Sequence, residues 1–208
     1  MASGSRRQSG CIDPKSWTIR LACGGHFLIE GERLDMSSIE IQKISIVDLD
    51  TDVIVNAANS GLLAGGGVCA AIFEAAGYDK LTKACNKIGH CKIGSAVITP
   101  GFDLKARYII HAVGPIYSDG RHGEAEMLYN AYKKSLELAV INGCKSIGFP
   151  LISAGIFGYP LDEAWELAVQ ACRNFIKANP DVEIDIIFAV LSDRIYKIGE
   201  WYLNRPDD

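Results

Sequence analysis

The chain has 208 residues, of which 49% are hydrophobic and 22% are charged, and its formal net charge is −4. This length and composition are typical of one globular domain with a short extension, and they exclude a solenoid, a coiled coil and a disordered chain. The negative charge, without a run of Lys or Arg, argues against long nucleic acid as the main partner, whereas main-chain amides can still bind a small anion.

Two short segments precede the part of the chain in which strands and helices alternate. Residues 1–16 are polar and rich in Gly, Ser and Arg, which is typical of a flexible leader. They lack the apolar segment of a secretory signal, and no apolar run in the chain approaches the ~20 residues that cross a bilayer. We therefore expect a cytoplasmic protein, or a nuclear one in a eukaryote, with no membrane partner. Residues 17–38 form an extension in which a Gly-Gly pair separates Trp17–Ala22 from His26–Glu30, and this pattern predicts a β-hairpin.

Residues 39–208 are predicted to form one α/β domain, because runs with strand patterns alternate with runs of helical period. In chain order we expect strands Ile39–Val47 and Asp52–Ala58, a helix Val68–Ala76, strands Ala96–Thr99 and Tyr108–Val113, a helix Glu124–Asn142, a strand Ser146–Leu151, a helix Leu161–Ala178, a strand Ile184–Leu191, and a helix that Asp193 caps and that ends near Leu203. This alternation predicts a largely parallel sheet with helices on both faces. Ligands of such sheets bind at the carboxyl ends of the strands.

The first loop at such a strand end runs from Asn56 to Val68 and contains Gly65, Gly66 and Gly67. Consecutive glycines let the main chain approach a ligand closely, and the first amides of the next helix direct partial positive charge at it. The loop is therefore either an anion site or a flexible glycine turn. It lacks Gly-Lys-Ser/Thr and the G-x-G-x-x-G spacing, which argues against a P-loop and against a Rossmann dinucleotide enzyme.

The second loop, Pro150–Pro160, also leaves a strand and enters a helix. Small residues at positions 153–155 expose successive N–H groups to a ligand. Phe157 either offers a flat apolar surface to a sugar or base, or packs in the core. Two such loops facing one another suit a diphosphate.

Five segments resemble the macrodomain (Appr-1″-p processing) family in their order and spacing. They are Asp52–Asn59 (DVIVNAAN), Leu62–Val68 (LLAGGGV), Ile98–Phe102 (ITPGF), Tyr108–Pro115 (YIIHAVGP) and Ser153–Pro160 (SAGIFGYP). The resemblance implies a three-layer α/β/α fold around a six-stranded mixed sheet, with ADP-ribose lying between the two loops. The subgroup it most resembles deacetylates O-acetyl-ADP-ribose and removes ADP-ribose from acidic side chains. The partners implied are ADP-ribose or a derivative and an ADP-ribosylated protein, with no cofactor, and we expect a monomer.

The resemblance also implies roles for single residues. Asn59 resembles the asparagine that bonds the distal ribose and helps to place the reacting group. The residues that resemble the ribose and phosphate loop, and then the diphosphate loop, are Gly65, Gly66, Gly67 and Val68, and Ser153, Ala154, Gly155, Ile156 and Phe157. Asn56 is expected to be a structural residue that holds the turn, because polar side chains in tight connections usually bond local backbone.

Two positions depart from the family pattern. Where the hydrolase subgroup has Gly-Val-Asp-Gly, with an aspartate that orients or activates water, this chain has Cys69. A thiol is a poor substitute for that carboxylate, so a hydrolase with weakened or altered catalysis and a non-catalytic ADP-ribose reader both stay open. Ser45, followed by Ile46, stands where the family has an adenine-binding aspartate, so that adenine selection is either weakened or taken over by Asp48.

The thiols and histidines leave further alternatives. Cys69 is either a nucleophile favoured by the helix dipoles or a small buried thiol, and His111, within a strand, is expected to be a core residue and not a base. Cys85, His90 and Cys91 lack a second ligand pair at zinc-site spacing, so we expect ordinary thiols and no metal. Because the cysteines are odd in number and never spaced as Cys-x-x-Cys, all are predicted to be reduced: Cys11, Cys23, Cys69, Cys85, Cys91, Cys144 and Cys172.

Overall fold

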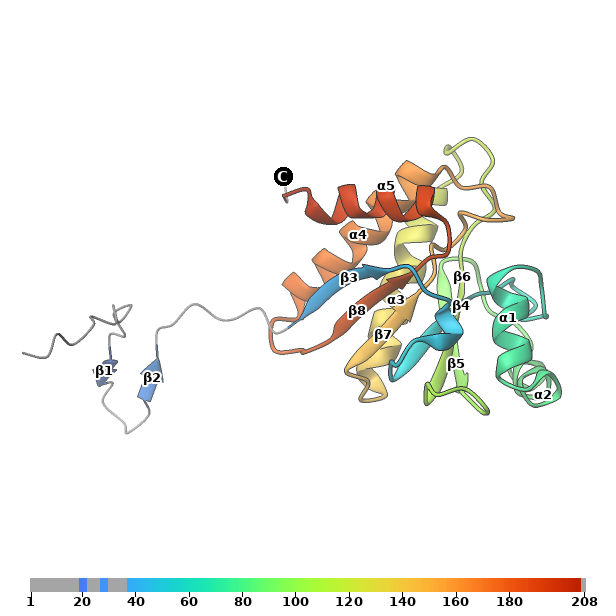
Figure 1. Ribbon diagram of the computed structural model, residues 1–208, viewed down its shortest axis with the longest axis horizontal. Coiled ribbons are helices and arrows are strands. Elements are labelled where there is room, and N and C mark those ends of the chain that lie inside the picture. Colours follow the sequence, from blue (N-terminus) through green and yellow to red (C-terminus); the bar gives the residue numbers. More distant parts are fainter. Residues whose placement is uncertain (1–18, 22–26, 30–36, 207–208) are drawn as a thin grey trace, which may run out of the picture. The chain divides into compact units, whose positions relative to one another are not determined.

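The computed structural model describes residues 19–21, 27–29 and 37–206 of the chain (Figure 1). Contacts divide the chain into two units, Met1–Asp35 and Met36–Asp208. In the first unit β1 (Ile19–Leu21) and β2 (Phe27–Ile29) pair antiparallel, as the predicted hairpin requires. The predicted leader and the Gly-Gly turn lie outside the described residues.

One mixed sheet forms the centre of the second unit, with the strand order β3-β8-β7-β4-β6-β5. Its strands are β3 (Ser38–Gln42), β4 (Val53–Ala57), β5 (Ser95–Pro100), β6 (Tyr108–Val113), β7 (Ser146–Phe149) and β8 (Asp185–Ala189). All neighbouring pairs are parallel except β5 with β6, so β5 is an antiparallel edge strand. The predicted six-stranded mixed sheet is confirmed.

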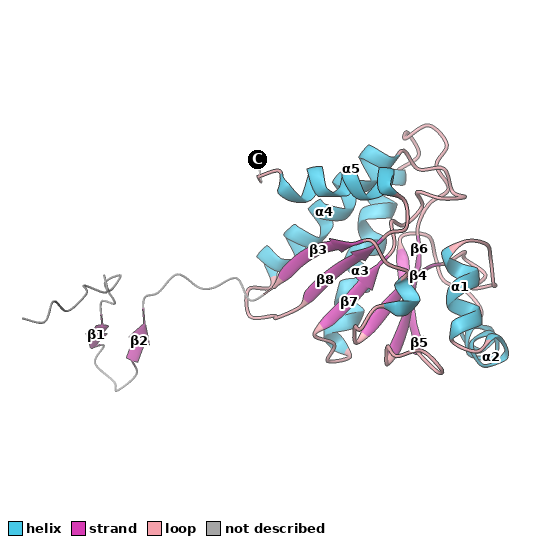
Figure 2. Cartoon of the chain, in the orientation of Figure 1, coloured by secondary structure: helices cyan, strands magenta, loops and turns pink. Residues whose placement is uncertain are grey.

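Helices cover both faces of this sheet, as Figure 2 shows. Their bounds are α1 (Val68–Ala75), α2 (Tyr78–Ile88), α3 (Glu124–Ile141), α4 (Leu161–Ala178) and α5 (Asp193–Asn204), with a short 3-10 helix η1 (Ile46–Asp48). Among these helices none is long and apolar enough to span a membrane. The α/β/α layers match the expected architecture.

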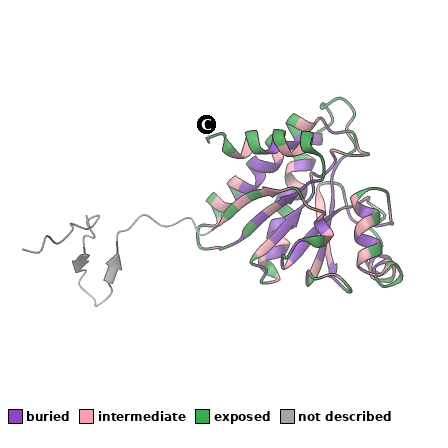
Figure 3. Ribbon diagram, in the orientation of Figure 1, coloured by how far each residue is buried: buried purple, intermediate pink, exposed green. Residues whose placement is uncertain are grey.

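The alternation of side chains along β4 divides the core into two layers. Val53 and Val55 lie in the layer with α3 and α4, whereas Ile54 and Ala58 lie in the layer with α1 and α2. Successive side chains of a strand point to opposite faces, so a strand covered on both faces is buried throughout its length. Figure 3 shows this buried stripe along the central strands.

Two sequence predictions were wrong in detail. The strand expected over Ile39–Val47 ends at Gln42, because the chain turns into η1 and buries the side chain of Ile46. The last helix begins at Asp193, with Ser192 as its N-cap, and the carboxylate of Asp193 pairs with Lys43 and does not cap the helix.

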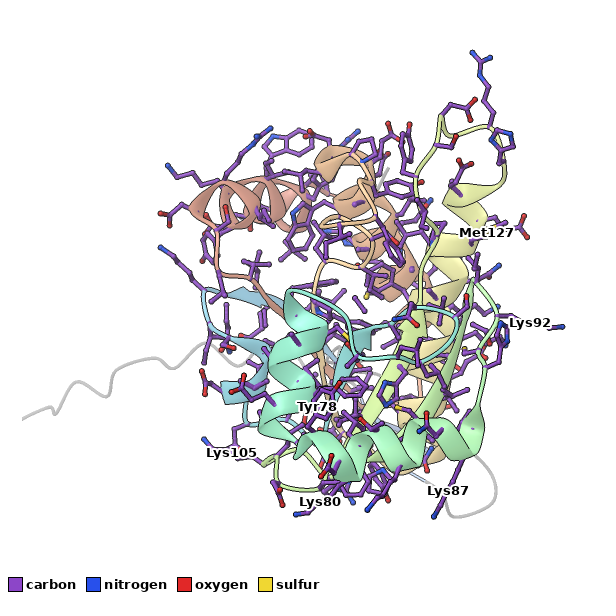
Figure 4. The ribbon with its side chains drawn as sticks, turned by 90° about the vertical axis from the view of Figure 1, so that its right-hand side faces the viewer. Tyr78, Lys80, Lys87, Lys92, Lys105 and Met127 are labelled. Carbon is purple, nitrogen blue, oxygen red and sulfur yellow. The ribbon has the colours of Figure 1, made fainter. Side chains whose placement is uncertain are left out.

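Helix α2 was not predicted at all. Its apolar residues Leu81, Cys85 and Ile88 recur at i, i+4 and i+7, so a helical period was an available signal in a mostly polar segment. Its other side chains are mostly exposed, and Lys80 and Lys87 point away from the sheet on the face shown in Figure 4.

Gly199 of α5 is the position at which helix propensity and packing disagree. Alanine normally stabilises a helix relative to glycine by about 1 kcal/mol. A Cβ atom at Gly199, however, would lie 2.5 Å from Cζ2 of Trp165 and 2.6 Å from Cδ1 of Ile41. Trp165 is fully buried, and its indole N–H donates to the carbonyl of Ile195 in α5, so the ring cannot move easily.

We therefore predict that Gly199→Ala lowers the free energy of unfolding by about 1–3 kcal/mol, against the helix propensity. Urea unfolding of the two proteins measures the difference. Gly155→Ala is the control, because no atom lies within 4 Å of a Cβ atom there, and it should change stability by less than about 0.5 kcal/mol. A Gly199→Ala variant that is more stable than the parent would show that α5 does not pack as described.

Candidate functional site

The first loop leaves β4 and is closed by the side chain of Asn59. Nδ2 of Asn59 donates to the carbonyl of Leu63 over 2.7 Å, and Oδ1 accepts the N–H of Leu63 over 3.1 Å. Between them, Leu62 is buried and has a left-handed φ of 56°. An amide nitrogen carries two hydrogens and an amide oxygen has two lone pairs, so each atom of Asn59 has capacity for one more partner.

The three glycines that follow are exposed at the amino end of α1. Gly67 is the N-cap of α1 with a φ of 60° and a ψ of −132°. Residues other than glycine rarely adopt this backbone conformation. Val68 is the first residue of α1 and is half-buried. The main chain from Gly65 to Val68 is thus presented where the helix dipole favours an anion.

The second loop leaves β7 and is positioned by Tyr132 of α3. The fully buried hydroxyl of Tyr132 accepts the N–H of Ile152 over 2.9 Å and lies 3.4 Å from the carbonyl oxygen of Pro150. Beyond this anchor, Ser153 is buried with a left-handed φ of 64°, and its Oγ has no hydrogen-bond partner among the described residues. Backbone strain and an unpaired buried polar atom in a non-glycine residue are typical of functional loops.

Gly114, just after β6, is what allows the second loop to lie this close. A Cβ atom there would lie 2.2 Å from Oγ of Ser153 and 2.7 Å from Cγ2 of Ile152. No role was predicted for Gly114 or Tyr132. A glycine directly after a buried strand was an available signal for close approach, whereas nothing in the sequence distinguishes Tyr132 from other core aromatics.

The two loops meet above neighbouring strands. Strands β4 and β7 are parallel neighbours, so both loops leave the same edge of the sheet. A Cβ atom on Gly66 would lie 3.1 Å from Cδ1 of Ile156, whose side chain is 81% exposed. Phe157 is half-buried, and its carbonyl accepts the N–H of Tyr117 over 2.8 Å. Ala154 is half-buried and Gly155 is exposed between these anchors.

The residues expected to select adenine lie in the short η1 helix, which packs against α1, and directly before it. Ser45 precedes η1, and its carbonyl accepts the N–H of Asp48 over 3.0 Å. The side chain of Ile46 is 3% exposed, so only its main chain can meet a ligand. Asp48 is exposed, and its carboxylate is within reach of solvent.

Comparisons with known proteins agree with this geometry. The Macro domain family model matches residues 55–168, more than half of the chain. The chain belongs to the macro domain family. It is 50% identical to a macro domain-containing protein, lmo2759, of Listeria monocytogenes, over 80% of this chain and 97% of that protein. It is 49% identical to an O-acetyl-ADP-ribose deacetylase of Escherichia fergusonii, over 67% of this chain and 81% of that one.

A solved structure is similar as well. The Trypanosoma brucei macrodomain in complex with ADP-ribose superposes with a TM-score of 0.73 and 37% identity, covering 78% of this chain and 68% of that one. The resemblance predicted from the five sequence segments is therefore confirmed for the family and the fold.

Within this macrodomain, Cys69 is buried in the first turn of α1, and its sulfur lies among polar atoms. The N–H of Gly65 donates to Sγ over 3.3 Å, Nδ2 of Asn56 donates to it over 3.6 Å, and the carbonyl oxygen of Leu63 lies 3.9 Å away. The prediction that Asn56 bonds local backbone was wrong. Its Nδ2 lies 3.1 Å from Nδ1 of His111 instead, because β4 and β6 place the two residues side by side.

His111 is a fully buried residue of the macrodomain core, as predicted. Burial lowers the pKa of its imidazole from 6.5 to about 4, so the ring is neutral at neutral pH. Its Nε2 lies 3.0 Å from Oγ1 of Thr99 and 3.9 Å from Sγ of Cys85. With Nδ1 accepting from Asn56, the proton resides on Nε2 and is donated to Thr99.

The described cysteines of the macrodomain are free thiols, in agreement with the predicted reduced state; Cys11 and Cys23 lie outside the described residues. Burial raises the pKa of the Cys85 thiol to about 11. Cys85 packs in the core, whereas His90 is exposed and Cys91 Sγ lies 3.7 Å from the carbonyl oxygen of Lys92. These three side chains do not form a metal-ligand group.

The lowered pKa of His111 makes stability depend on pH. The unfolded chain takes up a proton near pH 6.5 while the folded chain does so only near pH 4, so the stability contributed by neutral His111 is present above pH 6.5 and is lost as pH falls toward 4. Glutamine cannot titrate. We therefore predict that the free energy of unfolding of His111→Gln falls by about 2 kcal/mol less than that of the parent between pH 7 and pH 5. Urea unfolding at both values measures this, and equal losses in parent and variant would contradict a neutral, buried imidazole.

Proposed function

We propose that this macrodomain binds ADP-ribose or a derivative between its two loops and hydrolyses an ADP-ribose ester, either O-acetyl-ADP-ribose or an ADP-ribosylated acidic side chain. The observation that carries the proposal is the meeting of Gly66 and Ile156, which brings two exposed stretches of main chain together over neighbouring strands. Amides at a helix amino end suit a diphosphate, which is the charged part of ADP-ribose. The complex of the Trypanosoma brucei macrodomain with ADP-ribose supports the ligand.

In this proposal each loop binds one part of the ligand. The main chain of residues 65–68 contacts the distal ribose and the phosphate next to it, and residues 153–157 contact the diphosphate. Asn59 uses the remaining hydrogen and lone pair of its amide to hold the distal ribose. Ser45 and the main chain of Ile46 lie beside the adenine, with Asp48 as the alternative partner of its amino group.

The chemical step is the addition of water to the ester carbonyl, which releases ADP-ribose and a carboxylic acid. The name of the Escherichia fergusonii relative supports this reaction class. In the hydrolase subgroup an aspartate orients the water, but here Cys69 occupies that place with its sulfur already accepting two N–H groups. A phosphate of the substrate can orient the water instead, so slow turnover is expected.

The same observation favours a second candidate, a reader that binds ADP-ribose on proteins without turnover. Both loops are complete for binding, whereas the first turn of α1 has no acidic residue. The two candidates share one binding mode and differ only in whether a substrate ester is consumed.

We predict that the protein binds ADP-ribose more tightly than AMP or NAD, because AMP lacks the diphosphate and distal ribose and the nicotinamide of NAD occupies the place of the reacting group. Gly66→Glu should abolish binding, because a carboxylate would lie in the phosphate site. Gly66 does not have a left-handed φ, so the variant should keep the circular dichroism spectrum of the parent.

Calorimetric titration measures these affinities, and Gly66→Gln is the matched control for side-chain size. The neutral variant should bind more tightly than Gly66→Glu. Equal affinity of the parent for all three ligands, or full affinity in Gly66→Glu, would contradict the proposed site.

We also predict that Cys69→Asp raises the hydrolysis rate of O-acetyl-ADP-ribose, by up to about 100-fold. The N–H groups of Gly65 and Asn56 already point at this position and can hold a carboxylate, and the first turn of a helix favours its charge. Saturating turnover and affinity should be measured separately, since the new charge lies near the ligand phosphates.

Cys69→Asn is the control with the same size and no charge, and it should give no such increase. If Cys69→Asn is as fast as Cys69→Asp, the carboxylate does not act on water. If neither Cys69→Asp nor the parent consumes the ester while both bind ADP-ribose, the reader is the correct function.

A further inference from the structure

A chain of buried polar side chains leads from the centre of the sheet to the first loop. Asn56 and His111 are partners in the parallel register of β4 and β6. Ile54 and Ile109, two residues before them, lie in the core layer under α1 and α2, so Asn56 and His111 face the same layer. Most of that layer is apolar, so these two side chains depend on the few polar groups that lie near them.

The hydrogen bonds that link these polar side chains can all be assigned a donor and an acceptor. Neutral His111 donates from Nε2 to Thr99 and accepts at Nδ1 from one hydrogen of the Asn56 amide. The amide has one further hydrogen, and this one points to Sγ of Cys69. Oδ1 of Asn56 has no partner among the described residues, so the N–H bonds alone define how this side chain is held.

The sulfur of Cys69 connects this series of hydrogen-bonded side chains to the main chain of the first loop. It accepts from Asn56 on the side of the sheet and from the N–H of Gly65 on the side of the loop. Its own S–H is directed at the carbonyl of Leu63, to which Asn59 also donates. A thiol is a weak donor and a weak acceptor, and three contacts use its capacity, so the sulfur is occupied by protein groups on both sides.

We propose that Cys69 is a positioning residue, held by Asn56 and His111, whose sulfur fixes the main chain of Gly65 and so sets the shape of the glycine loop for its ligand. In this role the thiol acts on binding and takes no proton from water. The identity of the ligand rests on the proposed function, whereas the link from Cys69 to Gly65 does not.

Two measurements test this role. In Cys69→Ala the amide of Gly65 loses its acceptor, so its hydrogen exchange should become faster, and this readout needs no ligand. The same variant should bind ADP-ribose about 3- to 10-fold more weakly, which is the effect of losing one or two modest hydrogen bonds. For an ester substrate, KM should rise more than kcat falls, and the pH dependence of kcat should keep its form.

Two further variants separate positioning from a general loss of stability. Cys69→Ser keeps an acceptor at nearly the same place and should return the affinity to within about 3-fold of the parent. Cys172→Ala removes a fully buried free thiol from the other core layer, and it should leave both the Gly65 exchange and the affinity unchanged.

Several results would overturn the proposal. Unchanged exchange at Gly65 in Cys69→Ala would show that the sulfur does not hold the loop. A loss of kcat at constant KM, or the loss of a thiol-dependent limb in the pH profile, would make Cys69 a catalytic residue. A parent that does not bind ADP-ribose, with exchange at Gly65 still dependent on Cys69, would refute the proposed function and leave the positioning role supported.

Discussion

The parallel pairing of β4 with β6 on one side and β7 on the other is the constraint on which the site depends. Because parallel strands end at the same edge of a sheet, the chain leaves β4 and β7 side by side, and each strand feeds a loop into a helix. The register of β4 with β6 also places Asn56 beside His111. Asn56 in turn donates to Cys69, whose sulfur accepts the N–H of Gly65 in the first loop. One set of main-chain hydrogen bonds therefore positions both the residues proposed to contact a ligand and the residues that hold them.

Cys69 bears on the proposed function in two ways. In the proposal it stands where the hydrolase subgroup has an aspartate, and in the structure its sulfur lies where two N–H donors converge. Those donors would serve a carboxylate equally well, so the surrounding structure is compatible with either residue. The proposed hydrolase and the proposed reader therefore share one site and differ in turnover.

Much of the fold could be predicted from the sequence because its periodic signals are strong. The α4 bounds, Leu161–Ala178, were predicted without error, since a wide apolar stripe ends at an Asn-Pro pair. Helix α2 was missed although Leu81, Cys85 and Ile88 recur at helical spacing, because the segment around them is mostly polar. The glycine and small-residue loops could be recognised locally, but the contact of Gly66 with Ile156 and the bond from Asn56 to Cys69 join residues far apart or on different elements. Such contacts follow from strand register, which no single segment of the sequence encodes.

The anchoring of the second loop by Tyr132 connects the proposed ligand site to the deepest part of the core. The ring of Tyr132 packs against Phe149 at 5.2 Å and Phe188 at 6.2 Å between centroids, and Phe188 lies against Trp165. We expect a change in the size of any of these rings to shift the hydroxyl that holds Ile152, and the loop with it. A library of variants selected for altered ADP-ribose affinity should thus contain substitutions in this buried aromatic cluster as well as in the exposed loops.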